Sequence, residues 1–224
     1  ALEANPHAIR AGTRIKSEAK RLQRHVDLML DMTRLESGQI QSHQLAFDLD
    51  PLFDELLTNH AESAMTKGLE LVGPTPSGDG VRVSCDRQRL LRVLDELVDN
   101  AIKFTSKGSV HIGYCLSEPK SGRTELQITI EDTGIGIPPG MMPEIGRSFF
   151  QADPLSTHRF GGIGLGSHLA WRLAALLQGT IDFSSVLGKG SRFRFSLPVL
   201  VDAANPPVAL NSRTKPAAAG PYRI

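Results

Sequence analysis

The chain has 224 residues, which is the length of one large domain or of one domain with an appendage. Hydrophobic residues make up 40% and charged residues 22%, a composition that can build a core and excludes wholesale disorder. Lys and Arg (25) nearly balance Asp and Glu (24), and the net charge of +1 argues against a nucleic-acid partner, which would require a strongly basic face.

The number of cysteines and the length of the apolar runs indicate the cellular compartment. Cys85 and Cys115 are too few for a disulfide framework and lack the C-x-x-C spacing of a zinc or redox site. No apolar run approaches the roughly 20 residues of a membrane-spanning helix, and the N-terminus does not resemble a signal peptide. We therefore expect a cytoplasmic protein whose residues 1–224 make no contact with a membrane.

Residues 8–37 have the pattern of one long amphipathic helix. Apolar and small residues recur in steps of four and three, as in a coiled-coil seam: Ile15, Ala19, Leu22, Val26, Met29 and Thr33. A second apolar face indicates packing on more than one neighbour, and Gly38 is a suitable C-cap. The pattern predicts a helix of a helical bundle.

Strands and helices are then expected to alternate. Alternating residues predict a strand at 45–49, Pro51 opens a helix running to about Lys67, and Asp86 can N-cap a helix that runs through Phe104. The other expected strands are 68–72, 81–85, 110–116, 126–131, 180–185 and 192–197, with an irregular stretch at 132–164 and a helix at 165–177. The packed part is expected to end at Pro198. This gives three segments: 1–40, a partial bundle helix; 41–199, the main domain; and 200–224, a Pro/Ala-rich linker or tail.

Three segments could carry chemistry, and the first is Asp132–Pro138, directly after an expected strand. The Asp132 carboxylate can accept a hydrogen bond from an exocyclic amine. Gly134 and Gly136 carry no side chain, so a flat ring can approach the backbone there. Taken alone, the segment is equally a tight turn with an exposed Asp.

The second segment is one face of the helix ending at Phe104. Glu96, Asn100 and Lys103 are spaced by four and three residues and therefore share this face. Asn100 offers an oxygen to a cation such as Mg²⁺, Lys103 a charge for phosphate, and Glu96 a proton acceptor. Taken alone, this is an ordinary solvated helix face.

The third segment is Arg159–Gly166, which opens a helix. Free N–H groups at a helix N-terminus bind anions, and glycines allow a phosphate to come close. The spacing matches neither a P-loop nor a Rossmann fingerprint. Taken alone, a flexible hinge explains it as well.

Together the three segments resemble the ATP-binding domain of sensor histidine kinases, in the gyrase, heat-shock chaperone, histidine kinase and mismatch-repair ATPase superfamily. Five motifs follow in the family's order, covering roughly residues 10–198. They resemble the N box (Arg92–Thr105), the first glycine box (Asp132–Pro138), the F box (Phe149–Asp153), the second glycine box (Gly161–Gly166) and the closing hairpin (179–198).

The resemblance implies a fold and a function. The fold would be α/β: a two-layer sandwich of the Bergerat type, with a mixed, mostly antiparallel sheet covered on one face by helices and preceded by a long helix. The function would be transfer of the ATP γ-phosphoryl group to a histidine outside this fragment, in two-component signalling. The alternatives are a non-catalytic regulatory module that pairs with another kinase, or an ATPase machine of the superfamily.

The resemblance also implies a role for each site residue. Asn100 would hold Mg²⁺, Asp132 would bind the adenine amine, and Glu96 would assist the γ-phosphate step. The phosphates of ATP would be contacted by Lys103, Arg159, Gly162, Gly164, Leu165 and Gly166, and the ring of adenine would lie by Gly134 and Gly136.

The implied partners are a second copy, through the N-terminal helix, and a response regulator or receiver domain. The chain would be cytoplasmic, either as part of a soluble protein or as the cytosolic portion of a membrane-bound sensor. Four departures from the family pattern stand out. None of the seven histidines lies in a phosphoacceptor motif, residues 146–148 replace Phe-Glu-Pro, Ile163 stands where Thr is common, and Ser167 and His168 replace Leu-Ala.

Overall fold

The computed structural model describes residues 43–75, 80–117, 124–145 and 165–201, together with isolated positions between 12 and 33. Contacts divide the chain into two units, Ala1–Gln41 and Ser42–Ile224. In the first unit the described positions are all helical, as the predicted helix 8–37 requires: Gly12, Ala19, Gln23, Val26 and Thr33. The remainder of that helix lies outside the described residues. Within the described parts, no helix is long and apolar enough to span a membrane.

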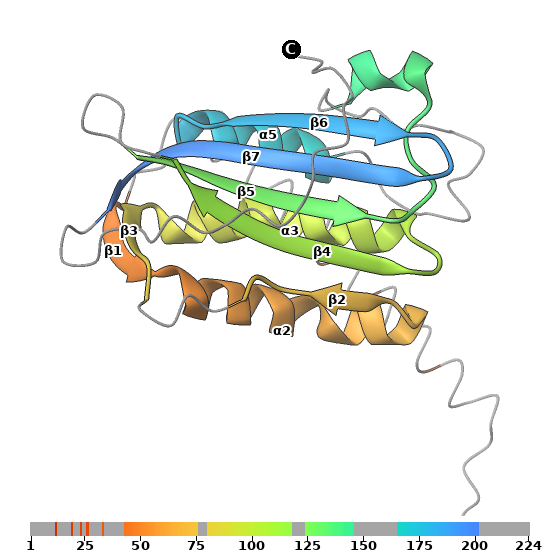
Figure 1. Cartoon of the computed structure of the whole chain (residues 1–224), viewed down its shortest axis with the longest axis horizontal. Helices are drawn as coiled ribbons and strands as arrows, with labels where there is room; N and C mark the ends of the chain where they lie inside the picture. Colours follow the sequence, from red (N-terminus) through yellow and green to blue (C-terminus); the bar gives the residue numbers. More distant parts are fainter. Residues whose placement is uncertain are drawn as a thin grey trace, which may run out of the picture. The chain divides into compact units, whose positions relative to one another are not determined.

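The second unit alternates strands and helices along the chain (Figure 1). In order, the elements are β1 (Leu45–Asp48), α2 (Leu49–Lys67), β2 (Glu70–Val72), β3 (Arg82–Cys85), α3 (Arg87–Phe104), β4 (Ser109–Leu116), β5 (Thr124–Asp132), the short 3₁₀ helix η1 (Pro139–Glu144), α5 (Leu165–Leu176), β6 (Thr180–Val186) and β7 (Gly190–Val201).

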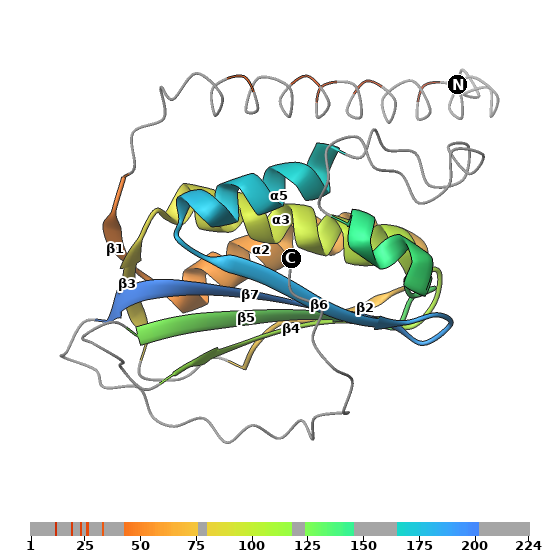
Figure 2. The same ribbon diagram turned by 90° about the horizontal axis from the view of Figure 1, so that it is seen from above.

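The strands form one mixed sheet in the order β1-β3-β7-β5-β4-β2, with β6 also paired to β7. β2 and β4 are parallel, and every other pair is antiparallel. Figure 2 shows α2, α3 and α5 together on one face of the sheet. The expected two-layer α/β sandwich with a mostly antiparallel sheet is therefore observed.

The core lies between the sheet and the three helices because each strand sends alternate side chains inward. On β5, Leu126, Ile128 and Ile130 are fully buried. Their neighbours point to the other face, where Glu131 pairs with Arg192 of β7. One face of the sheet is thus apolar and helix-covered, and the opposite face is polar.

Three differences from the sequence predictions bear on the fold. β2 begins at Glu70 and not at Gly68, because Gly68 takes the left-handed conformation (φ +64°) that caps α2. A 3₁₀ helix, η1, forms within the stretch expected to be irregular. β7 runs to Val201, beyond the expected end at Pro198, because its last residues pair with Val83 and Ser84 of β3.

Strand β7 can contain Pro198 because this residue lies between the stretches that pair with β6 and with β3. Pro198 follows the residues that pair with β6 and precedes those that pair with β3. On that side of β7 it lies between the two paired stretches, where a missing N–H removes no ladder bond. The packed part was expected to end at this proline, and the structure continues β7 three residues further, to Val201.

Candidate nucleotide-binding site

Helix α3 is the element on which the site is built. Asp86 caps its N-terminus by accepting a hydrogen bond from the Arg89 amide at 3.1 Å, as the sequence predicted. Its apolar side packs into the core through fully buried residues such as Leu90 and Leu94. Helix α3 is therefore held at its start and along one whole side.

The face of α3 that carries Glu96 and Asn100 contacts the beginning of α5. The Asn100 side-chain amide donates to the Ser167 hydroxyl at 3.2 Å. A Cβ on Gly166 would meet the end of the Glu96 side chain, so glycine at this position lets the Glu96 carboxylate lie against the start of α5. Glu96 is only 7% exposed. For this residue, the interpretation as a solvated helix face is wrong.

The C-terminal end of α3 contacts the loop that follows β5. The Ile135 amide donates to the carbonyl of Phe104, the last residue of α3, at 3.2 Å. A Cβ on Gly134 would lie 2.5 Å from the same carbonyl oxygen. Within the loop, the Gly134 amide donates to Asp132 Oδ1 at 2.8 Å. The loop is thus folded against the helix end, with the Asp132 side chain held by its own backbone.

The hairpin of β6 and β7 supports the loop from the other side. Gly136, at φ +68°, passes so close to the backbone of Val186 that a Cβ would overlap it. The Ile137 amide donates to Ser185 Oγ at 2.8 Å. Gly190, at φ +110°, lies directly against the backbone of Asp132. Three glycines of this region are therefore required by close approach of other backbone segments of the chain. For Gly134 and Gly136 the sequence predicts a different reason, the approach of a flat ring, and that reason stays a prediction.

Asp132 lies in a partly dry environment. Burial raises the pKa of the Asp132 carboxyl, whereas hydrogen bonds from the backbone of Gly134 and from the backbone and hydroxyl of Ser191 act to lower it. These donors hold the carboxylate in one orientation. A carboxylate that is fixed and partly desolvated is suited to accept a hydrogen bond from a ligand amine.

Cationic charge is present at the same end of α3. The Lys103 ammonium lies 4.9 Å from the centre of the ring of Phe104, the residue whose carbonyl accepts a hydrogen bond from the glycine loop. Lysine binds phosphate as a mobile point charge. From Glu96 to Phe104, α3 spans roughly 12 Å along its axis at 1.5 Å per residue. One helix therefore aligns a polar face with a carboxylate-bearing loop.

The structure describes seven of the expected site residues. Three lie on α3, three at the end of β5 or on the loop after it, and one at the start of α5: Glu96, Asn100, Lys103, Asp132, Gly134, Gly136 and Gly166. Leu165 is described through its backbone alone, as the first residue of α5. Arg159, Gly162, Gly164 and the Phe149–Asp153 segment lie outside the described residues.

Sequence reasoning missed three residues that support the site. Ser185 and Ser191 were assigned only to the closing hairpin, although they bond the loop that carries Asp132. Lys67 was treated only as the end of a helix. The pairing of Asp132 with Ser191 follows from the register of β5 against β7, and no local signal in the sequence reveals it.

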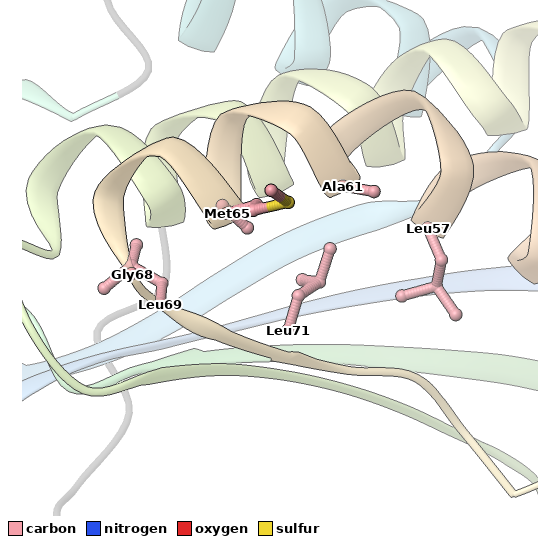
Figure 3. A pocket seen from close by; sticks show the side chains of 7 residues that line it. Leu57, Ala61, Met65, Gly68, Leu69 and Leu71 are labelled. Carbon is pink, nitrogen blue, oxygen red and sulfur yellow. The ribbon is translucent and has the colours of Figure 1, made fainter.

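A separate pocket of about 450 Å³ lies between α2 and β2. Leu57, Ala61 and Met65 face it from α2, and Leu71 faces it from β2 (Figure 3). Its lining is apolar and offers no charged group for a phosphate. The candidate nucleotide site is therefore the one along α3 and not this pocket.

Comparison with known proteins agrees with this geometry. The family model described as "Histidine kinase-, DNA gyrase B-, and HSP90-like ATPase" matches residues 85–201. The chain is 33% identical over 183 residues to the sensor protein GacS of Pseudomonas syringae pv. syringae, and 34% identical over 183 residues to the histidine-protein kinase BarA of Escherichia coli K12. Each match covers 82% of this chain and 20% of the relative, so the chain spans about a fifth of these proteins.

Solved structures show the same fold. Full-length ShkA in complex with AMPPNP is similar with a TM-score of 0.69 and 26% identity, over 90% of this chain and 41% of that one. The nucleotide-free catalytic domain of the histidine kinase ThkA is similar with a TM-score of 0.54 and 24% identity, over 70% of this chain and 95% of that one. The second likeness concerns the fold alone.

Proposed function

Because the chain belongs to the histidine kinase-, DNA gyrase B- and HSP90-like ATPase family, as its motifs predicted, we propose that it is the ATP-binding catalytic core of a sensor histidine kinase. In this proposal it transfers the γ-phosphoryl group of ATP to a histidine on another segment. One observation carries the proposal. A single helix, α3, contacts both the loop of Asp132 and the start of α5.

In the proposed complex, adenine lies against the glycine loop and its amine donates to Asp132. The phosphates extend along α3 toward the start of α5, where N–H groups at the helix N-terminus donate hydrogen bonds to an anion. Lys103 neutralises phosphate charge, and Arg159, Gly162, Gly164 and the Leu165 backbone complete the phosphate contacts. Glu96, at the buried end of this path, orients the group that attacks the γ-phosphate.

A magnesium ion fits the donor set on α3. The Asn100 amide nitrogen donates to Ser167 Oγ, which leaves the amide oxygen as the atom available to a hard cation. When bound with ATP, Mg²⁺ would neutralise charge on the phosphate oxygens during transfer. Asn100 would hold it, and the Ser167 hydrogen bond would keep the amide oxygen turned outward.

The whole protein's partners follow from the same proposal. The N-terminal helix would mediate homodimerisation, and a response regulator or receiver domain would take the phosphoryl group from the histidine. The catalytic unit would act in the cytoplasm. Two similar relatives are a sensor protein and a signal transduction histidine-protein kinase, which supports two-component partners of this kind.

A second candidate is a non-catalytic regulatory module that binds nucleotide and pairs with another kinase. One observation favours it. The start of α5, which lies against the proposed magnesium ligand Asn100, departs from the family pattern at Ser167 and His168. Under this alternative, ATP binds and no phosphoryl transfer follows.

Calorimetric titration of the chain with ATP, with and without Mg²⁺, tests the proposed site. We expect binding that Mg²⁺ strengthens. Asp132→Asn should weaken it by about 1–3 kcal/mol, or roughly 5–150-fold, because the amide can present a donor to the adenine amine. The matched control is Asp54→Asn, which makes the same change at an exposed position of α2. It should bind ATP as the unchanged protein does.

The transfer step is tested by adding a histidine-containing bundle domain from a relative together with radiolabelled ATP. Labelled histidine supports the kinase proposal, and ATP binding without any label supports the regulatory module. If ATP does not bind with or without Mg²⁺, both candidates fail.

A further inference from the structure

Lys67 connects two helices at the edge of the proposed site. It is the last residue of α2, since Gly68 follows in the left-handed capping conformation. Its ammonium donates to the Ile102 carbonyl at 2.7 Å, to that of Lys103 at 2.8 Å and to that of Thr105 at 3.3 Å. All three acceptors belong to the end of α3 or to the residue that follows it.

These are carbonyls that an α-helix cannot satisfy by itself, because its last four C=O groups have no intrahelical donor. The Phe104 carbonyl, between two of the carbonyls that Lys67 binds, accepts the Ile135 amide of the glycine loop. Along the end of α3, successive carbonyls are therefore bound in turn by Lys67, by the Ile135 amide and again by Lys67. Lys67 holds the carbonyls on both sides of the one that binds the loop.

Charge strengthens this arrangement. The reach of Lys67 to α3 means that α2 and α3 end side by side, and each helix C-terminus carries roughly half a negative charge. A cation between them stabilises both ends. The pKa of Lys67 is lowered by burial, and the neighbouring Asp99 partly opposes this shift. Against this desolvation, the Asp99 carboxylate favours the charged form, and the three carbonyls accept hydrogen bonds from the ammonium.

We propose that Lys67 is a positioning residue for nucleotide binding: by fixing the carbonyls around Phe104, it sets where the Asp132 loop lies relative to Asn100 and Lys103. The role rests on the proposed function, because it concerns the same site. Lys67 itself does not touch the nucleotide. It acts through the Phe104–Ile135 hydrogen bond.

The test compares three substitutions in the full chain. Lys67→Met removes the charge and the donors at nearly constant length. Lys67→Arg keeps the charge and offers several donors to the same carbonyls. Lys107→Met is the matched control, since it removes a lysine charge from an exposed position in the loop just after α3.

Two quantities are measured: the dissociation constant for ATP, by calorimetry, and the amide hydrogen exchange of Ile135 without nucleotide. We expect Lys67→Met to raise both by about tenfold, Lys67→Arg to recover most of each, and Lys107→Met to change neither. The thermal midpoint of each variant is recorded in parallel. If Lys67→Met does not fold, Lys67→Gln replaces it, and its effect on both quantities should lie between that of Lys67→Arg and the tenfold change expected of Lys67→Met.

The outcomes separate positioning from simple stability. If Lys67→Met accelerates exchange uniformly over the domain and leaves ATP affinity unchanged, Lys67 is a structural cap and the proposal is overturned. Failure of Lys67→Arg to recover ATP affinity overturns it as well. If the unchanged chain binds no ATP, the proposed function fails, and selective exchange at Ile135 still decides whether Lys67 positions the loop.

Discussion

Gly134→Ala is the substitution by which the contact between α3 and the glycine loop can be tested most directly. The new Cβ would lie 2.5 Å from the Phe104 carbonyl oxygen, 2.9 Å from the carbonyl carbon and 2.8 Å from Asp132 Oδ1. Two of these atoms are backbone, which cannot rotate away as a side chain can. Because Gly134 does not have a positive φ, the conflict is one of space and not of backbone strain.

The size of the effect follows from these distances. An ordinary van der Waals contact begins near 3.4 Å, so the loop must withdraw from α3 by about 0.9 Å. The Ile135–Phe104 hydrogen bond, now 3.2 Å, would then exceed hydrogen-bonding length. Overpacking costs about 1–3 kcal/mol and a lost hydrogen bond about 0.5–1.5 kcal/mol. A displacement near 1 Å in the site should also weaken ATP binding, by roughly 10–100-fold.

Thermal unfolding and calorimetric ATP titration measure the two effects. Gly140→Ala is the control, since a Cβ there meets nothing within 4 Å and the residue has no positive φ. It should change stability by less than about 0.5 kcal/mol and leave ATP affinity intact. If Gly134→Ala matches Gly140→Ala in both measurements, the close contact between the loop and α3 is refuted.

Two further predictions concern the groups that face the ligand. Because burial raises the pKa of Asp132, its ionised form costs the nucleotide-free protein stability above that pKa, and the cost disappears as the pH falls through it. The thermal midpoint of Asp132→Asn should therefore gain most over the unchanged chain at neutral pH and lose this advantage on acidification. The affinity of the unchanged chain for ATP should fall over the same pH range, because the protonated carboxyl is a poorer acceptor. If the thermal midpoints of the unchanged chain and of Asp132→Asn depend on pH in the same way, this prediction is contradicted. Ser167→Ala removes the acceptor of the Asn100 amide. It should reduce the gain in ATP affinity from Mg²⁺ by roughly threefold to tenfold, with Ser184→Ala as control, and an equal loss with and without Mg²⁺ would contradict the role.

Some parts of the fold could be predicted from the sequence because their signals are local. The helix from Arg87 to Phe104 has a capping Asp86 and a clear apolar face, and both its ends were predicted closely. The strands at 110–116 and 126–131 were found because β-branched and apolar residues alternate there. In each case, one short window contained the whole signal.

The errors arose where a local signal had a different tertiary meaning. Gly68 suggested the start of a strand and instead caps the preceding helix. Pro198 suggested the end of the domain, although β7 continues past it because β3 supplies a new partner strand. The residues of a strand do not by themselves determine which other strand pairs with it.

The candidate site, like the fold, has features that local residues predict and features that only tertiary contacts determine. The order of Asn100, Asp132 and Gly166 along the chain was sufficient to suggest a nucleotide site, since each residue type has a chemical role there. The support of that site was not predictable. Lys67 bonds to a carbonyl 35 residues later in the chain, and Ser191 reaches Asp132 only through the register of two strands.

The continuity of α3 explains how distant segments can form one site. The Asp132 loop and the start of α5 come from different parts of the chain, and each binds α3 through its own contact, at Phe104 and at Asn100. Because the helix between these two residues is regular, its rise and twist fix the spacing and direction of the two halves. Fastening the end of α3, as Lys67 does, therefore acts on both halves of the site. A substitution that frees this end should lower affinity for ATP even though no atom that contacts the nucleotide has changed.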